Sequence, residues 1–271
     1  MIKFAAAGFM CIDWYPQFEG TSRSYVTGNG VDVLFNLIDM RGDIEPSVVA
    51  AISDDELGKW AVREFEKRNF DMKYLDIVPG GATTTYEILL KNGDRFHNHV
   101  ERGIFENYEF SDEAVEFLCS CDCMHTDFTG HLIERLPQIH AAGTKIFFDF
   151  SKKSLIHPDT DKVLPYIECG LASFEDDEEG AVGFLKRGTA LGAKLLIATF
   201  GEKGSLVYDG KEFTRGGIVP VTNLVNTVGA GDSFFAGFIA RYLDGAPIPE
   251  CIQSGAARSA AVIQTWKPYL E

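Results

Sequence analysis

The chain has 271 residues, and its 40 Asp and Glu outnumber its 25 Lys and Arg, so the formal net charge is −15. Hydrophobic residues make up 45% and charged residues 24%, a composition typical of a globular protein rather than a disordered one. The acidic excess argues against binding to nucleic acid or to anionic membranes, because both depend on clustered Lys and Arg. It does not exclude an anionic substrate, because a few converging backbone amides can bind a phosphate group.

The N-terminal segment is apolar from Phe4 to Ile12 and is interrupted by Asp13, where a secretion signal would end in small residues. We interpret it as a buried first strand. No run of residues approaches the roughly 18 apolar residues of a membrane-spanning helix. The six cysteines show no disulfide-scaffold spacing, and a chain of this length does not need one. We therefore expect a reduced, cytoplasmic protein with no membrane partner.

Short apolar segments alternate with amphipathic segments along the chain. The predicted strands are Phe4–Cys11, Ser47–Ile52, Asp122–Thr126, Lys145–Phe150, Gly170–Ala172, Leu195–Thr199 and Ser205–Tyr208. The predicted helices are Val31–Met40, Gly58–Arg68, Asp112–Cys119, Glu178–Arg187, Ser233–Leu243 and Pro249–Thr265. This alternation predicts an α/β fold with a mostly parallel central sheet covered by helices on both faces.

Two segments interrupt the alternation. Residues 14–27 are polar and aromatic without a helical period, and residues 83–102 have the pattern of two strands joined by Asn92-Gly93-Asp94. Together they predict a small β lid over one edge of the α/β body, and lids close over substrates and exclude water. No repeat or Pro-, Gly- or Ser-rich linker divides the chain, which predicts one domain over residues 1–271. Asp209-Gly210, between apolar runs, predicts a hairpin turn.

The run from Cys119 to His125 has two interpretations. On a strand, Cys119, Cys121, Cys123 and His125 would share one face and could bind zinc. Structural zinc sites, however, more often use Cys pairs from turns, separated by two to four residues. The favoured interpretation is a helix end that leads into a buried strand, where free cysteine behaves as a small hydrophobic residue.

The segment from Asn226 to Ser233 places Gly229, Ala230 and Gly231 at a loop-to-helix junction, with Asp232 next. Without bulky side chains, the backbone amides can converge on an anion at the positive end of the helix. A carboxylate beside a bound phosphate is unfavourable unless it has a task, such as accepting a proton from an attacking hydroxyl. The alternative is a helix cap after a tight turn. The Walker-A pattern of P-loop NTPases is absent.

These residues resemble the DTxGAGD signature of the ribokinase-like (pfkB-type) carbohydrate kinases. The match extends over nearly the whole chain, in order. It includes Ala7-Gly8 with Asp13 on the first strand, residues 27–32 (TGNGVD), residues 53–58 (SDDELG) and residues 199–204 (TFGEKG). Within the family the sequence is most similar to the fructoselysine 6-kinases, through the segments CIDWYPQ, QIHAAGTKIFFDFS and NTVGAGDSFFAGF.

The resemblance implies a three-layer kinase fold, ATP with Mg²⁺, and phosphorylation of a sugar's primary hydroxyl, most specifically that of fructoselysine. It implies Asp232 as general base, with the amides of Gly229, Ala230 and Gly231 as the anion hole. The implied ATP-binding residues are Thr199, Gly201, Gly204 and Thr227. The implied sugar-binding residues are Asp13, Gly28, Asn29, Asp32, Glu101 and Arg102. Asp149, at a strand end, is expected to help order the phosphate region.

Several positions depart from the family pattern. The first Asp of DTxGAGD is Asn226, and Phe9 replaces an acidic residue common after the first glycine. The first Gly and the Asn of the pattern GGxAxN are Thr27 and Asp32. In place of the NxxE motif that supports Mg²⁺ stands an acidic run, residues 175–179, in which Asp176 and Glu179 are the metal candidates. Most of that run is interpreted as a solvated helix start.

The altered charges suggest a hypothesis about the substrate. Asp32, together with Asp13 and Glu101, favours an acceptor that carries a cationic amine, as fructoselysine does. A kinase for a plain ketose, ribose or a nucleoside is an alternative, and so is a non-catalytic sugar-binding relative. The absence of GxGxxG after the first strand disfavours a nicotinamide-dependent oxidoreductase. Family lids often pair, so a homodimer through the lid is a further expectation.

Overall fold

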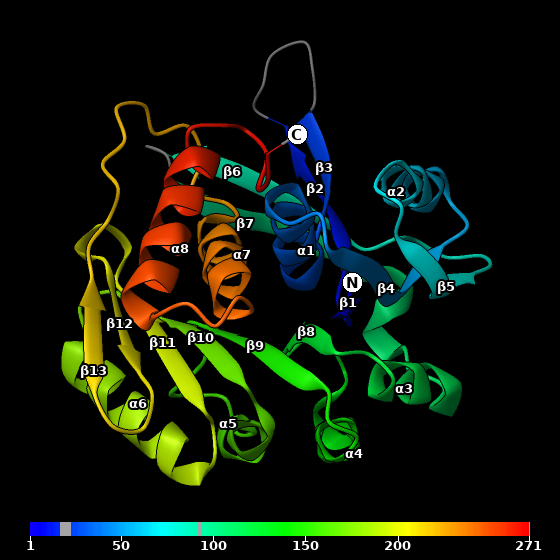
Figure 1. Cartoon of the computed structure of the whole chain (residues 1–271). Helices are drawn as coiled ribbons and strands as arrows, with labels where there is room; N and C mark the ends of the chain where they lie inside the picture. Colours follow the sequence, from blue (N-terminus) through cyan, green and yellow to red (C-terminus); the bar gives the residue numbers. More distant parts are fainter. Residues whose placement is uncertain (17–22, 92–93, 271) are drawn as a thin grey trace.

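The structure is a computed structural model that describes residues 1–16, 23–91 and 94–270. Within these residues a nine-stranded sheet has the order β13-β12-β11-β10-β9-β8-β1-β4-β5 (Figure 1). In chain order its strands are β1 (Ile2–Ala7), β4 (Ile44–Ser53), β5 (Asp71–Val78), β8 (Cys123–Asp127), β9 (Lys145–Ser151), β10 (Cys169–Ser173), β11 (Leu195–Thr199), β12 (Ser205–Tyr208) and β13 (Phe213–Gly216). The strands from β11 across to β5 are parallel, and β12 and β13 are antiparallel. The predicted hairpin at Asp209-Gly210 is therefore confirmed.

Helices cover both faces of this sheet, as predicted. One face carries α1 (Asn29–Met40), α2 (Glu56–Lys67), α7 (Ala230–Tyr242) and α8 (Ile248–Val262). The other face carries α3 (Asp112–Cys119), α4 (Leu136–Ala141), α5 (Thr160–Val163) and α6 (Glu178–Leu191). The two faces correspond to two apolar cores, and Figure 1 shows the helices above and below the strands. Burial of these apolar faces is the main source of stability, at about 25 cal/mol per Å².

The predicted first strand, Phe4–Cys11, is two strands. β1 ends at Ala7, and β2 (Cys11–Tyr15) begins after a turn at Gly8, whose φ of 114° suits glycine. A Cβ at Gly8 would lie 2.5 Å from the Cα of Gly130, so another side chain would clash there. The turn matters because it carries Asp13 out of the large sheet and into a second, smaller one.

The second sheet has the order β3-β2-β6-β7, built from β2, β3 (Arg23–Thr27), β6 (Thr85–Lys91) and β7 (Asp94–Glu101). β2 pairs antiparallel with β3 and parallel with β6. The predicted lid segments, about 14–27 and 83–102, supply most of these strands. Within them, residues 17–22 and Asn92-Gly93 of the predicted turn lie outside the described residues. The role of this sheet as a lid stays a prediction.

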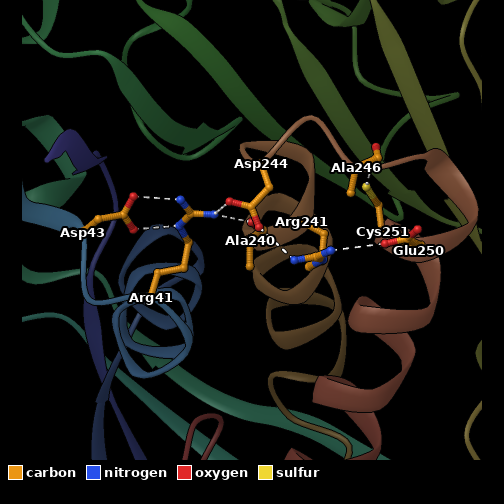
Figure 2. Close-up of polar contacts among 8 residues, drawn as sticks. All are labelled: Arg41, Asp43, Ala240, Arg241, Asp244, Ala246, Glu250 and Cys251. Atoms are coloured by element: carbon orange, nitrogen blue, oxygen red, sulfur yellow. Dashed lines mark hydrogen bonds and ion pairs between the residues drawn. The ribbon is translucent and has the colours of Figure 1, made fainter.

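A polar network joins α1, α7 and α8 at the ends that lie away from the second sheet (Figure 2). The Arg41 guanidinium bonds both carboxylate oxygens of Asp43, the Ala240 carbonyl and the Asp244 carboxylate. Arg241 then pairs with Asp244 and Glu250, at the start of α8. These charge-assisted bonds hold α7 against its neighbours, and α7 carries Asp232 at its other end.

The cysteine run from Cys119 to His125 adopts the favoured arrangement. Cys119 ends α3, and Cys123 and His125 lie on β8. All six thiols are free, and among the described residues no group of three potential ligands could hold a metal ion. Burial raises the pKa of the Cys121 thiol to about 11 and that of Cys123 to about 12, as expected of small hydrophobic side chains. In the same residues no helix is both long and apolar enough to span a bilayer.

Candidate active site

Helix α7 begins directly behind a glycine turn. Gly229 has a φ of 76°, a left-handed conformation that glycine adopts without strain. A Cβ at Gly229 would lie 2.5 Å from the Cβ of Pro268, so the C-terminal segment packs closely against the turn. The turn therefore presents backbone, rather than side chains, at the positive end of the helix. That arrangement favours an anion.

The predicted anion-hole residues lie in this turn. Their setting is tight, because the Ser233 amide and hydroxyl both donate to the Gly229 carbonyl, at 2.8 and 2.6 Å. The Ala230 amide donates to the Thr227 carbonyl at 3.2 Å, so it must leave that bond to bind an anion. Asp232 is half-buried in the first turn of α7. The structure thus places the predicted base beside the predicted anion site.

Asn226 holds the start of this turn. Its side chain is almost completely buried, and its Oδ1 accepts the Val228 amide at 3.0 Å. Its Nδ2 donates to the Trp266 carbonyl at 3.1 Å and contacts the Tyr15 hydroxyl at 3.3 Å. One amide side chain therefore joins the turn, the C-terminal segment and β2. An aspartate at this position could not donate to the Trp266 carbonyl, which gives a physical reason for Asn226 here.

Asp13 and Asp32 lie on the other side of Tyr15. Asp13 is on β2 and Asp32 is in the first turn of α1, and their exposed fractions are 7% and 3%. The Thr27 hydroxyl donates to Asp32 Oδ2 at 2.5 Å. Burial raises the pKa of Tyr15, and the charges of Asp13 and Asp32 raise it further. The two predicted sugar-binding carboxylates therefore lie close enough to affect the same hydroxyl that contacts Asn226.

Gly28 brings the start of α1 against the turn after β1. Its φ is 136°, and a Cβ there would lie 2.6 Å from the Phe9 carbonyl oxygen and 2.8 Å from the Met10 Cα. A side chain would separate the two segments. Gly28 therefore lets the backbone before α1 approach the backbone at Phe9 and Met10 closely. The next residue, Asn29, begins the helix.

Sequence reasoning missed Asp127, and the structure places it at the centre of this pocket. The Asn29 Nδ2 donates to Asp127 Oδ2 at 2.6 Å and lies 3.4 Å from Asp149 Oδ2. Asp127 and Asp149 are paired in register on adjacent parallel strands, and both are buried. The signal that could have found Asp127 is its place directly after a predicted strand, because parallel strands end at the site in α/β folds.

We use the name acidic pocket for the cluster of side chains formed by Asp13, Asp32, Asp127 and Asp149, all buried, with Asn29. Burial raises the pKa of Asp127, although the Thr129 amide and hydroxyl, both 2.6 Å from Oδ1, partly offset this effect. Burial also raises the pKa of the Cys11 thiol, with added repulsion from Asp13, Asp32 and Asp127. The three carboxylates therefore gather around one thiol. Such a site can accept hydrogen bonds from sugar hydroxyls or bind an amine.

Aromatic side chains form one wall near this pocket. Phe9 packs edge-on against Tyr86 at 5.7 Å and Phe105 at 5.6 Å between ring centroids. Phe9, one of the predicted departures from the family pattern, therefore makes an apolar contact between the turn after β1 and Tyr86 on β6. Tyr86 lies opposite Asp13 in the β2–β6 register.

The two lid residues predicted to bind substrate differ in placement. Burial raises the pKa of the Tyr86 hydroxyl, Cys11, Asp13 and Asp127 raise it further, and the Arg102 charge lowers it, so Arg102 shares these surroundings. Glu101 pairs with Thr85, and Thr85 pairs with Ile12. Because side chains alternate along a strand, Glu101 points to the face opposite Asp13. The structure brings Arg102 toward the pocket and does not bring Glu101 there.

The predicted nucleotide loop follows β11. Thr199 ends the strand, and the Phe200 amide donates to the Gly204 carbonyl at 2.8 Å across a short helical turn. A Cβ at Gly204 would lie 2.1 Å from the Gly216 carbonyl oxygen, so this glycine is needed for close packing against β13. Gly201, with a φ of 57°, has open space around its Cα. Of the two glycines, only Gly201 leaves room for a ligand.

The two metal candidates, Asp176 and Glu179, are both exposed near the start of α6. Asp176 forms an ion pair with Lys203, and Asp177 caps α6 by accepting the Gly180 amide at 2.8 Å. Glu179 is exposed in the first turn of the helix. In the described part of the chain, no three Asp, Glu, His or Cys side chains are placed so that together they could hold a metal ion. These residues do not form a protein cage for Mg²⁺, and the acidic run behaves largely as the predicted solvated helix start.

Comparison with known proteins identifies the chain. The model of the pfkB family carbohydrate kinases matches residues 166–269. A fructoselysine 6-kinase of Escherichia coli (strain K12) is 31% identical over 264 residues, which are 97% of this chain and 98% of that protein. The chain belongs to the pfkB family of carbohydrate kinases. This finding confirms the predicted family, and it makes the chain a sugar kinase.

A second sequence relative and a solved structure are also similar to this kinase. The fructosamine kinase FrlD of Bacillus subtilis (strain 168) is 26% identical over 266 residues, covering 96% of this chain and 90% of that protein. The solved structure of an Arabidopsis thaliana ribokinase, complexed with ribose and ATP, superposes with a TM-score of 0.80 at 18% identity. It covers 98% of this chain and 94% of the ribokinase. The predicted ribokinase-like fold is thus confirmed.

Proposed function

We propose that this kinase transfers the γ-phosphoryl group of ATP to the primary hydroxyl of a fructosamine, with fructoselysine as preferred acceptor and fructoselysine 6-phosphate as product. The observation that carries the proposal is the acidic pocket, joined through Tyr15 and Asn226 to the glycine turn that bears Asp232. Similarity to a fructoselysine 6-kinase and to a fructosamine kinase, each over nearly the whole chain, supports the same substrate class.

The proposed reaction assigns each part of the site one task. Asp232 accepts the proton of the acceptor hydroxyl, whose oxygen forms the new bond to the γ-phosphorus as the bond to the ADP oxygen breaks. The amides of Gly229, Ala230 and Gly231 stabilise the charge that develops on the transferred group. Loss of one such donor typically lowers the rate by about 10²–10³-fold.

ATP binding is proposed at the loop after β11, where Gly201 leaves space and Thr199 and Thr227 are the polar side chains expected nearby. Mg²⁺ commonly keeps several waters and binds through phosphates with one or two carboxylates. Among the described residues, no group of three potential ligands could hold the ion. The proposed site therefore binds Mg²⁺ together with ATP, through the phosphates. Its contribution when bound is to neutralise phosphate charge.

The acidic pocket supports a cationic acceptor. Asp13, Asp32 and Asp127 are buried, and buried carboxylates are stabilised when they pair with a cation or accept hydrogen bonds. Fructoselysine carries a protonated amine next to its sugar, so it can bring both hydroxyl donors and a positive charge to this pocket. A plain ketose or ribose brings hydroxyls alone.

The test is an assay of ADP release with Mg-ATP against fructoselysine, glucoselysine, fructose, ribose and adenosine. We expect the highest kcat/KM with fructoselysine, and formation of a 6-phosphate that ³¹P NMR identifies. Preferential turnover of ribose, fructose or adenosine would replace the proposed substrate class. No sugar-dependent ADP release on the whole panel would favour a non-catalytic sugar-binding protein.

A further inference from the structure

A second concave region lies between β3 and the C-terminal segment, next to the small sheet. It is a groove of about 290 Å³ whose lining includes Arg23, Tyr25, Trp266, Lys267 and Tyr269. The Tyr269 hydroxyl donates to the Val26 carbonyl at 3.2 Å, so the C-terminal segment is fixed to β3 (Figure 1). We call this region the basic groove.

Positive charge gathers at this groove although the chain as a whole is acidic. The Arg23 guanidinium lies 4.6 Å from the centroid of the Trp266 ring. Burial lowers the pKa of Lys267, and the charges of Arg68 and Lys67 lower it further. Glu64 acts in the opposite direction, but its carboxylate also pairs with Lys67 and Arg68. An anion near Lys267 would relieve this repulsion.

Strand β3 connects the basic groove to the acidic pocket. Arg23, Tyr25 and Thr27 alternate along the strand and therefore lie on one face. Arg23 and Tyr25 line the groove, whereas Thr27 donates to Asp32 in the pocket. At roughly 3.3 Å per residue, the Cα atoms of Arg23 and Thr27 are about 13 Å apart. That separation is comparable to the length of an extended sugar joined to a lysine side chain.

The middle of this face adjoins the sugar site. Tyr25 lies opposite Asp13 in the β2–β3 register, and its ring packs edge-on against Tyr15 at 5.8 Å. A ligand whose sugar contacts Asp13 would reach Arg23 by passing Tyr25, whose side chain is buried in one cluster with Tyr15 and Val228. The Trp266 ring is partly buried, packs against that cluster and forms an apolar side of the groove, where an aliphatic chain could lie.

We propose that the basic groove binds the α-carboxylate end of a glycated amino acid, with Arg23 and Lys267 as the cationic contacts. This inference rests on the proposed function, because it assumes a fructosamine acceptor in the acidic pocket. It assigns opposite charges of one substrate to opposite regions of the site. The amine beside the sugar lies among the carboxylates, and the carboxylate of the amino acid lies among the cations.

The experiment compares fructoselysine with N-fructosylcadaverine, which has the same sugar, amine and aliphatic chain but no carboxylate. The kcat/KM of each is measured for wild type, Arg23→Gln, Lys267→Gln and the matched control Arg63→Gln, an exposed cation on α2. We expect Arg23→Gln and Lys267→Gln each to lower kcat/KM for fructoselysine by about 10-fold. Turnover of N-fructosylcadaverine, which shows that the variant is folded and active, is expected to stay within about twofold of wild type.

The outcomes separate the two levels of the proposal. An equal loss with both substrates, or an unchanged ratio between them, would overturn the carboxylate site while leaving fructosamine phosphorylation intact. If wild type phosphorylated neither fructosamine but accepted fructose, ribose or adenosine, the proposed function would fail and the carboxylate site with it. A selective loss in Arg63→Gln would show that the effect is one of net charge, and would also overturn the site.

Discussion

The acidic pocket and the basic groove both adjoin the small sheet, through Asp13 on β2 and Arg23 on β3, yet they are built in different ways. The carboxylates of the pocket are buried, and internal donors such as Asn29, Thr27 and Thr129 hold them in place. The cations of the groove are half-buried, and Arg23 lies against the ring of Trp266. The pocket is thus fixed by a hydrogen-bond network, whereas aromatic faces and charge define the groove.

This difference shows why the net charge of −15 says little about the site. Acidic and basic side chains are segregated over a short distance along β3, and the field that a substrate meets depends on those nearby groups. The phosphoryl group depends on a third arrangement, the backbone amides of the glycine turn. Each of these arrangements can be disturbed separately.

The largest expected effect comes from Asp232→Asn, which changes no residue of the acidic pocket or the basic groove. Removing a general base typically lowers kcat by about 10²–10⁴-fold. We expect kcat to fall in that range with KM for fructoselysine nearly unchanged, measured by steady-state ADP release. Such a result would assign the chemical step to Asp232 and leave substrate binding to the acidic pocket and the basic groove. Equal turnover by the variant would remove Asp232 as the base.

Arg41 provides a cation remote from both regions. Its bonds to Asp43, Ala240 and Asp244 join α1 to α7 (Figure 2), and its side chain is largely buried. Because hydrogen bonds to charged groups contribute about 1.5–3 kcal/mol, Arg41→Met is expected to lower the free energy of unfolding by about 2 kcal/mol. Urea denaturation checks the value, with Arg63→Met as the control.

The same variant bears on the comparison of the two charged regions. If Arg41→Met kept the wild-type ratio of fructoselysine to N-fructosylcadaverine turnover, selectivity would belong to the groove rather than to cations in general. A shift in that ratio would mean that a cation outside the groove also affects selectivity, so the groove would not be its specific source.

Much of the α/β body could be predicted from the sequence. Helix α3 and strands β11 and β12 occupy their predicted ranges. The edge strand β5 was missed because most of its side chains are at least partly exposed, so it lacks a continuous apolar run. The break between β1 and β2 was missed because apolar residues surround the turn at Gly8.

The site was predictable where its residues lie in short motifs or at the ends of predicted strands. The turn at Gly229 and the carboxylate of Asp232 are adjacent in sequence, so the pattern revealed them. Asp127 is a single carboxylate whose importance comes from Asn29, about a hundred residues earlier in the chain. The basic groove forms only where β3 meets the C-terminal segment, and no local pattern encodes that meeting.

A smaller effect is expected from Asp32→Asn, which tests the acidic pocket directly. Removing this buried charge weakens attraction to a cationic amine and leaves a group that can still bond Thr27. We expect the ratio of kcat/KM for fructoselysine over fructose to fall by about 10-fold, corresponding to about 1.4 kcal/mol. Asp54→Asn, an exposed change, serves as control. An unchanged ratio would show that Asp32 does not contribute to the preference for an acceptor with a cationic amine.

The smallest expected effect concerns Asp127 and the stability of the pocket itself. Burial raises the pKa of this carboxyl above its unfolded value, so the folded state binds its proton more tightly than the unfolded state does. Its favourable contribution is complete below the unfolded pKa of about 3.9 and is lost as the pH rises through the folded pKa. Asp127→Asn removes that dependence, because an amide does not titrate in this range.

The stability of Asp127→Asn relative to wild type should therefore increase as the pH rises from about 4 to 8. Urea unfolding at several pH values measures this difference, and Glu66→Gln, an exposed change on α2, is the control. If the difference in unfolding free energy did not change with pH, the pKa of Asp127 would be the same in the folded and unfolded states. The hydrogen bonds from Asn29 and Thr129 would then fully offset the effect of burial. In that case the acidic pocket would be preorganised for a neutral polyol as well as for an amine, and the basic groove alone would select the amino-acid end of the substrate.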